Sequence, residues 1–234
     1  MAQPVCLITG AGEGTGAATA RRFAAGGYRT ALLARTETRL KRLEGEIEGA
    51  RGYVCDVSNL DELKNTIAKV RTELGAPTVV LHNAVAGAFQ TVLEADPIRF
   101  EEIFRTNATA LMMLAQCVAP DMVKNGKGAI IVTGNTSAWR GKPNFSMFAP
   151  TKAAQRILAE SMARDLGPKG VHVAYLTVDA AIDTPFTRPR LFPNRPDDFF
   201  CKPAAIAEEI FHIAHQDPSV WSFAVEIRPY HENW

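Results

Sequence analysis

The sequence predicts an α/β fold, a doubly wound parallel sheet of seven strands with helices on both faces. Three observations lead to this prediction. Short apolar segments alternate with longer amphipathic ones along the chain, as in successive βαβ units. The short segments are apolar throughout, which is typical of strands that are buried on both faces. A glycine-rich turn joins the first strand to the first helix, and such turns bring backbone amides to a helix N-terminus.

The first half of the chain supplies four strands, expected at 5–9, 28–34, 52–55 and 79–82. The first helix, 15–25, ends at two consecutive glycines, which favour a helix C-terminus. The second, 36–47, is amphipathic. The third, 58–74, is expected to begin with Ser58 as its N-cap, because acidic residues follow in the first turn, where the helix dipole stabilises them.

The second half supplies three strands, expected at 129–133, 171–178 and 223–228. A long helix is expected at 97–124, since proline suits a first helical turn. Further helices are expected at 146–166 and 204–215. The proline- and phenylalanine-rich segment 180–203 is predicted to be a loop that covers the substrate. No repeat or linker interrupts the pattern, so residues 1–234 are expected to form one domain.

Composition narrows the class of protein. The 234 residues carry 26 Lys and Arg against 25 Asp and Glu, a net charge of +1, which argues against a nucleic-acid or membrane surface. No apolar run reaches the roughly 18 residues of a membrane span, and the first residues do not resemble a signal peptide. The four cysteines form no CxxC pair. We therefore expect reduced thiols, no bound metal and a cytoplasmic location.

The first strand–helix turn carries the clearest chemistry. Residues 9–16 read TGAGEGTG. Glycines permit a tight turn and a close approach of the backbone to a pyrophosphate, which the N-terminus of the following helix attracts. The sequence therefore predicts a Rossmann-type dinucleotide site rather than a packing turn without a ligand. The expected contacts are Gly10, Gly12, Glu13, Gly14, Thr15 and Gly16.

The spacing of three of these glycines, Gly10, Gly14 and Gly16, resembles the Gly-x-x-x-Gly-x-Gly pattern of the short-chain dehydrogenase/reductase (SDR) family. Later landmarks follow in the family's order over nearly the whole chain. The resemblance implies cofactor contacts at the adenine, at the Asn-Ala-Gly turn and at the nicotinamide carboxamide. The residues at these positions are Asp56 with Val57, Asn83 with Ala84, and Thr184, respectively. It also implies that Asn107 and Lys152 are the family's catalytic Asn and Lys, with Lys152 contacting the cofactor as well.

The end of the second strand bears on the choice of dinucleotide. An acidic residue there would bond the ribose 2′-hydroxyl of NAD, but the chain has Ala34 and Arg35. A guanidinium can hold a 2′-phosphate, so NADP(H) is predicted. NAD(H) stays possible, because Arg35 can be a solvated charge and Glu13 lies where NADP-preferring relatives often carry a base.

The chain departs from the family at the proton-transfer group. The family's Tyr lies four residues before the Lys, on the same helix face, and the ammonium lowers a phenol pKa that starts near ~10. Phe148 stands at that position, and Phe145 stands at the seven-residue spacing used by enoyl reductases. The family's Ser position is Asn135, and the adjacent Thr136 and Ser137 are candidates for its role.

Two functions remain open. In the first, the chain is an NADP(H)-dependent oxidoreductase of a small carbonyl or alcohol, with an altered proton path. Lys152 and Asn107 then hold a water or act directly on the substrate oxygen, with Thr136 or Ser137 as hydrogen-bond donor. In the second, it is a non-catalytic dinucleotide-binding sensor or assembly subunit, in which Lys152 only grips the ribose.

The surface and the tail suggest partners. The resemblance and the apolar residues 111–114 of the long helix imply a homodimer or homotetramer. The tail, with Tyr230 and His231, is predicted to be an interface anchor, or else to supply an acid to a neighbouring subunit. His82, at the end of the fourth strand, is expected to be a packed histidine rather than a base.

Overall fold

The computed structural model describes residues 3–232 and confirms the predicted fold. Its seven-stranded sheet has the order β3-β2-β1-β4-β5-β6-β9, and every neighbouring pair is parallel. The strands are β1 (Val5–Thr9), β2 (Arg29–Ala34), β3 (Ala50–Val54), β4 (Pro77–His82), β5 (Gly128–Gly134), β6 (Val171–Val178) and β9 (Ala224–Ile227).

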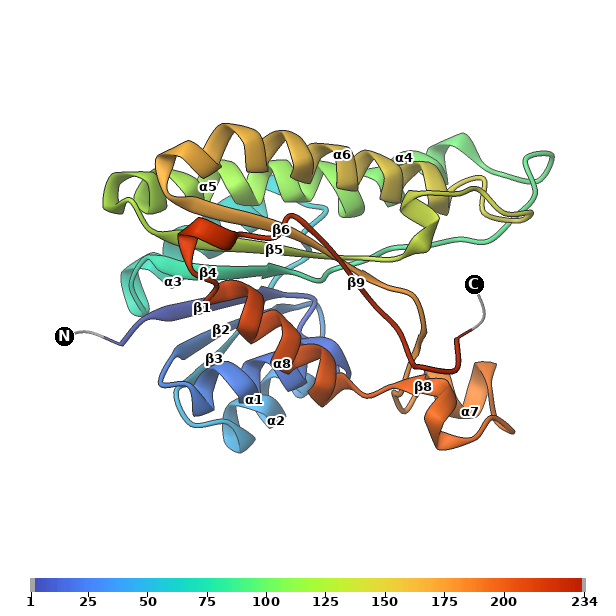
Figure 1. Ribbon diagram of the computed structural model, residues 1–234, viewed down its shortest axis with the longest axis horizontal. Helices are drawn as coiled ribbons and strands as arrows, with labels where there is room; N and C mark the ends of the chain where they lie inside the picture. The colour runs from blue at the N-terminus through green and yellow to red at the C-terminus, as the bar shows by residue number, and fades with distance from the viewer. Residues whose placement is uncertain (1–2, 233–234) are drawn as a thin grey trace.

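Helices cover both faces of this sheet (Figure 1). Those on one face are α3 (Leu60–Glu73), α4 (Pro97–Phe104), α5 (Ala110–Asn125) and α6 (Phe148–Leu166). Those on the other are α1 (Thr15–Ala25), α2 (Glu37–Glu46) and α8 (Pro203–Ala214). Each face encloses its own cluster of buried apolar side chains, which explains why the strand segments are apolar throughout.

Crossing from β1 to β4 reverses the direction in which strands are added, so the carboxyl ends of these two strands border a crevice. In open α/β sheets, ligands bind at such a switch point. The β1–α1 turn and the end of β4 both lie there. The topology therefore positions the candidate site at this edge of the sheet.

The long helix expected at 97–124 is interrupted, which corrects that prediction. A π-helical turn, Arg105–Thr109, separates α4 from α5. The side chain of Asn107 within this turn is buried and bonds both the amide and the carbonyl of Ala86. These contacts bridge residues distant in sequence, so the helical periodicity of 97–124 carries no sign of them. Such π turns often accompany functional sites.

Two smaller predictions are also wrong. Asn59, not Ser58, caps α3, because its Oδ1 accepts the amide of Glu62 at 3.2 Å. The Ser58 hydroxyl instead donates to Asp56 at 2.7 Å. Helix α6 begins at residue 148 rather than 146.

The segment 180–203 is not a plain loop. It contains the paired short strands β7 (Ala181–Ile182) and β8 (Phe200–Cys201) and the helix α7 (Thr187–Leu191). Across residues 3–232, no helix has the length and apolar character to cross a membrane.

Candidate active site

The β1–α1 turn has no room for side chains at two of its glycines. Gly10 has φ +68°, and a Cβ there would lie 2.7 Å from the backbone of Ala84. A Cβ on Gly16 would lie 2.6 Å from the Gly10 carbonyl oxygen. Gly14 is the N-cap of α1 and supplies no side-chain acceptor. The first amides of this helix therefore remain available to an anion.

Side chains from β1 and β4 hold this turn in place. Thr9 Oγ1 accepts the amides of Asn83 at 3.2 Å and Ala84 at 3.3 Å. Asn83 Nδ2 donates to the Gly10 carbonyl at 2.9 Å, and Asn83 Oδ1 accepts from Thr133 at 3.1 Å. The side-chain amide of Asn83 therefore links the carboxyl ends of the adjacent strands β1, β4 and β5.

Among the charged residues around the turn, Arg35 forms no ion pair in residues 3–232. Glu13 pairs with Arg42 of α2 at 3.0 Å, so a positive charge lies beside its carboxylate. Arg35 is exposed and makes no hydrogen bond or ion pair with any residue between 3 and 232. Asp56 Oδ1 accepts from the amide of Ser58 at 2.9 Å, and Val57 is buried in the core. Arg35 lies near enough to Asp56 to help lower the pKa of that carboxyl, after its hydrogen bonds with Ser58, but forms no ion pair with it. Its guanidinium at the end of β2 can therefore take an anionic ligand group.

Lys152 lies buried on α6, beside the end of β5. Its Nζ donates to the Thr133 carbonyl at 3.0 Å and to Oε1 of Gln155. Gln155 Nε2 in turn donates to the Asn107 carbonyl at 2.7 Å. Burial lowers the pKa of Lys152 to about 7. A lysine with that pKa can give or take a proton near neutral pH.

Asn107 takes part in this arrangement through its main chain only. Its side-chain Nδ2 donates to the Ala86 carbonyl at 2.9 Å and to Thr151 Oγ1 at 2.8 Å. Its Oδ1 accepts the Ala86 amide at 2.9 Å. The side-chain amide therefore holds the segment after β4, while the carbonyl faces Gln155.

An aromatic cluster occupies the position of the missing phenol. Phe148 is buried, with its ring centroid 5.3 Å from that of Phe89 and 6.2 Å from that of Phe145. Phe89 and Phe145 are 5.0 Å apart. Neither Phe148 nor Phe145 can move a proton, so this wall of the site is apolar.

The three residues after β5 have different roles. Thr136 Oγ1 donates to Asp179 at 3.0 Å, and Asn135 Oδ1 accepts the Ser137 amide at 3.1 Å. The Ser137 hydroxyl makes no hydrogen bond within the part of the chain that the structure describes. It borders a cavity of about 620 Å³ that Trp139, Phe145 and Pro150 also line. Ser137 is thus the hydroxyl of this group best placed to meet a substrate.

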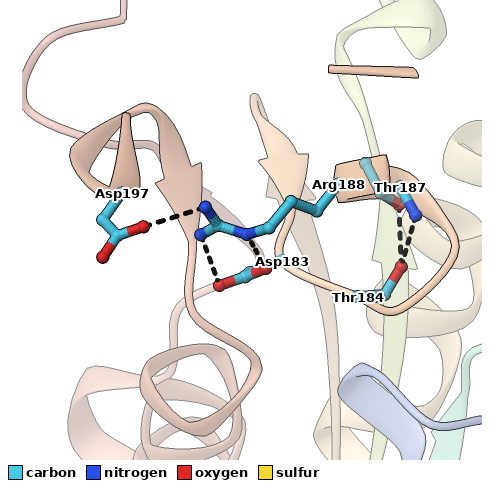
Figure 2. Close-up of polar contacts among 5 residues, drawn as sticks. All are labelled: Asp183, Thr184, Thr187, Arg188 and Asp197. Atoms are coloured by element: carbon cyan, nitrogen blue, oxygen red, sulfur yellow. Dashed lines mark hydrogen bonds and ion pairs between the residues drawn. The ribbon is translucent and has the colours of Figure 1, made fainter. Parts of the chain in front are cut away.

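The segment after β6 closes over the glycine turn. Thr184 packs on Gly14, since a Cβ there would lie 2.8 Å from the Thr184 methyl group. We call this segment, residues 180–203, the lid. Ion pairs of Arg188 hold it together. The Arg188 guanidinium pairs with Asp183 through two bonds of 2.8 and 2.9 Å and with Asp197 at 2.8 Å (Figure 2).

The C-terminal tail returns to this lid. His231 Nδ1 lies 3.2 Å from an Asp198 carboxylate oxygen, and Tyr230 is largely exposed. The contact is made within one chain, so His231 is placed on the lid of its own subunit. Asn233 and Trp234, also part of the predicted anchor, lie outside the described residues, as do Met1 and Ala2.

Comparison with known proteins decides the family. A family model described as short chain dehydrogenase matches residues 4–191, more than half of the chain. The chain belongs to the short-chain dehydrogenase family. The family resemblance drawn from the glycine spacing and the later landmarks is thereby confirmed.

Individual relatives are diverse. The chain is 33% identical to (+)-cis,trans-nepetalactol synthase NEPS2 of Nepeta racemosa, over 79% of this chain and 72% of the relative. It is 30% identical to the 3-oxoacyl-[acyl-carrier-protein] reductase MabA of Mycobacterium tuberculosis, over 78% and 70%. It is 29% identical to human L-xylulose reductase, over 71% and 67%.

Solved structures agree with the fold. A short-chain dehydrogenase from Rhodopseudomonas palustris is 31% identical, with a TM-score of 0.83 over 97% of this chain and 99% of that one. An alcohol dehydrogenase from Thermococcus sibiricus, complexed with 5-hydroxy-NADP, is 27% identical, with a TM-score of 0.87 over 99% and 98%.

In this short-chain dehydrogenase, the structure brings the predicted catalytic positions together at the carboxyl ends of β4 and β5. Sequence reasoning missed Gln155 and Thr151. One signal was present, because Gln155 lies three residues after Lys152 on the same side of a helix. A polar side chain on the buried face of α6 requires a partner.

Proposed function

We propose that the protein is an NADP(H)-dependent oxidoreductase of a small carbonyl or alcohol substrate, in which Lys152 replaces the missing tyrosine as the proton-carrying group. The observation that carries this proposal is the buried ammonium of Lys152. Two of its hydrogens are held by Thr133 and Gln155, and the third has no partner in residues 3–232. That hydrogen is available to a substrate oxygen or to a water beside it.

The residues present fit the dinucleotide. The crowded glycines and the uncapped start of α1 form a cradle for a pyrophosphate. Arg35 supplies a guanidinium without an ion pair for a 2′-phosphate. The ion pair with Arg42 offsets part of the negative charge of Glu13, which would otherwise disfavour that phosphate. When bound, the nicotinamide gives or accepts the hydride. The NADP analogue in the Thermococcus sibiricus relative supports this choice of cofactor.

The protein's own groups supply the remaining chemistry. The Ser137 hydroxyl can donate a hydrogen bond to the substrate oxygen, which orients the substrate. Lys152 then delivers a proton to that oxygen during reduction or removes one during oxidation. The ring of Phe148 excludes water from one side of the site, and exclusion of water strengthens the electrostatic contacts inside it.

The alternative is a dinucleotide-binding protein without turnover. The packed cluster of Phe148, Phe145 and Phe89 favours it, because this cluster fills the position of the family's proton donor with rings that have no proton to give. The name of the nepetalactol synthase relative also shows that not every similar protein is named as a reductase.

An assay of aldehydes, ketones and alcohols with NADPH or NADP distinguishes the two functions. We expect wild-type turnover, and a fall of about 10²–10⁴-fold in Lys152→Met while NADPH still binds. Lys169→Met, which alters an exposed lysine on the surface, is the matched control. Turnover that Lys152→Met leaves unchanged would refute the role of Lys152. Binding without turnover in wild type would favour the alternative.

We also propose that the protein is cytoplasmic and forms a homodimer or homotetramer. Supporting the second point, Phe104, Met112 and Ile157 are exposed apolar side chains on α4, α5 and α6. Light scattering coupled to size-exclusion chromatography tests it. A strictly monomeric species at micromolar concentration would contradict it.

A further inference from the structure

The side chain of Gln155 is fully buried between two groups of the candidate active site. Its Oε1 accepts from Lys152 Nζ, and its Nε2 donates to the Asn107 carbonyl at 2.7 Å. The chemistry of the partners fixes this orientation. An ammonium can only donate and a carbonyl can only accept, so the reversed amide would face each of them with the wrong group.

The amide therefore fills the whole distance between Lys152 and the π-helical turn. Burying an amide without partners is unfavourable, but here both of its ends are satisfied. An amide N–H does not ionise near neutral pH. A proton on Lys152 therefore has no exit toward Asn107 through this contact.

His82 is the titratable group of the neighbouring strands that faces Lys152. Thr9 Oγ1 already accepts two backbone amides, so its own hydrogen is left for His82 Nδ1, 3.2 Å away. The imidazole proton then sits on the buried Nε2, and the Asn107 carbonyl interacts with the imidazole, which favours its charged form. Burial, and next the charge of Lys152, lower the pKa of His82 to about 3. His82 stays neutral and exchanges no proton with Lys152 at physiological pH.

We propose that Gln155 is a positioning residue that anchors Lys152 to the Asn107 carbonyl and confines proton exchange by Lys152 to its remaining free hydrogen. The proposal deepens the function proposed above and rests on it for its catalytic meaning. It assigns Gln155 no contact with substrate. The amide acts by fixing the place and the protonation of Lys152.

Two substitutions separate these effects. Gln155→Glu places a carboxylate against the ammonium, which favours the charged lysine and should raise the pKa of Lys152 by about 1–3 units. Gln155→Met keeps the length of the side chain but removes both hydrogen bonds. It withdraws an acceptor from the charged form, so the pKa of Lys152 should fall. Gln216→Glu, an equivalent change far from the site, is the control.

The decisive measurement needs no turnover. Cofactor-free protein labelled with ¹³C at lysine Cε is titrated by NMR, and Lys152→Met identifies the Lys152 signal. We expect that signal to titrate higher in Gln155→Glu, lower in Gln155→Met and unchanged in Gln216→Glu. If Gln155→Glu does not fold, Gln155→Met carries the test alone. Unchanged Lys152 titration in every folded Gln155 variant would overturn the proposal.

Kinetics add the catalytic part. The pH limb of kcat should move with the Lys152 titration in each variant, while the KM for NADPH changes less than about twofold. A parallel loss of cofactor affinity would indicate a general distortion and would overturn the positioning role. If the titrations move as expected but no substrate is turned over, the proposed function fails and the contact with Lys152 stands.

Discussion

Replacing Arg35 by alanine should weaken NADPH binding without affecting NADH. Arg35 is exposed and makes no hydrogen bond or ion pair in residues 3–232, so its loss should leave the fold intact. A hydrogen bond to a charged group is worth about 1.5–3 kcal/mol. Because solvent screens an exposed pair, we expect the lower half of that range. This corresponds to a Kd for NADPH about 12- to 40-fold higher.

The assay follows nicotinamide fluorescence as NADPH or NADH is titrated into wild type, Arg35→Ala and Arg99→Ala. Arg99 is an exposed arginine of α4 that pairs only with Glu102 in the described structure, which makes it a matched control. The NADPH effect should shrink as salt is raised, since the interaction is electrostatic. Equal losses for both nucleotides, or no loss for either, would refute the role of Arg35 in binding a 2′-phosphate.

Three further predictions concern turnover and the lid. Phe148→Tyr places a phenol one helical turn from Lys152 and should raise the rate of carbonyl reduction by about 10²-fold or more. Steady-state rates test this. The same gain in Phe148→Leu would show that packing alone is responsible. Reduction needs the protonated form of Lys152, whose pKa is about 7. The kcat/KM of reduction should therefore fall as pH rises through about 7, while that of alcohol oxidation should rise. A flat profile between pH 6 and 8 would count against Lys152. Arg188→Met removes partly exposed ion pairs, which are individually weak, so the KM for NADPH should rise by about two- to fivefold and the lid should be cut faster by protease. Arg190→Met is the control, because the only contact of the Arg190 guanidinium among residues 3–232 is with the ring of Phe186. Equal effects of the two changes would argue against the role of Arg188 in holding the lid.

The features that the sequence predicted well are local. The glycine spacing of the β1–α1 turn, the apolar strands and the residue ending β2 are each set by a few neighbouring positions. Their meaning follows from backbone sterics and from the parallel topology. The same logic identified Phe148 as a departure, because its spacing from Lys152 along one helix face is fixed.

The features that it missed depend on contacts between distant segments. The π-helical turn is tied to a bond between Asn107 and Ala86, which only the folded chain brings together. The cap of α3 depends on the partner of the Ser58 hydroxyl. That hydroxyl donates to Asp56, so Asn59 caps the helix instead. The lid is ordered by Arg188, whose partners Asp183 and Asp197 lie on either side of it.

The contact between His231 and Asp198 has a practical consequence for anyone who expresses this protein. His231 lies against the lid (Figure 1), so a fusion partner or affinity tag attached behind the tail would disturb this contact and the segment that bears Thr184. The first described residues lead into the start of β1, a central strand of the sheet, at the opposite end from the β1–α1 turn. Tags placed there should report the native behaviour of the enzyme more faithfully.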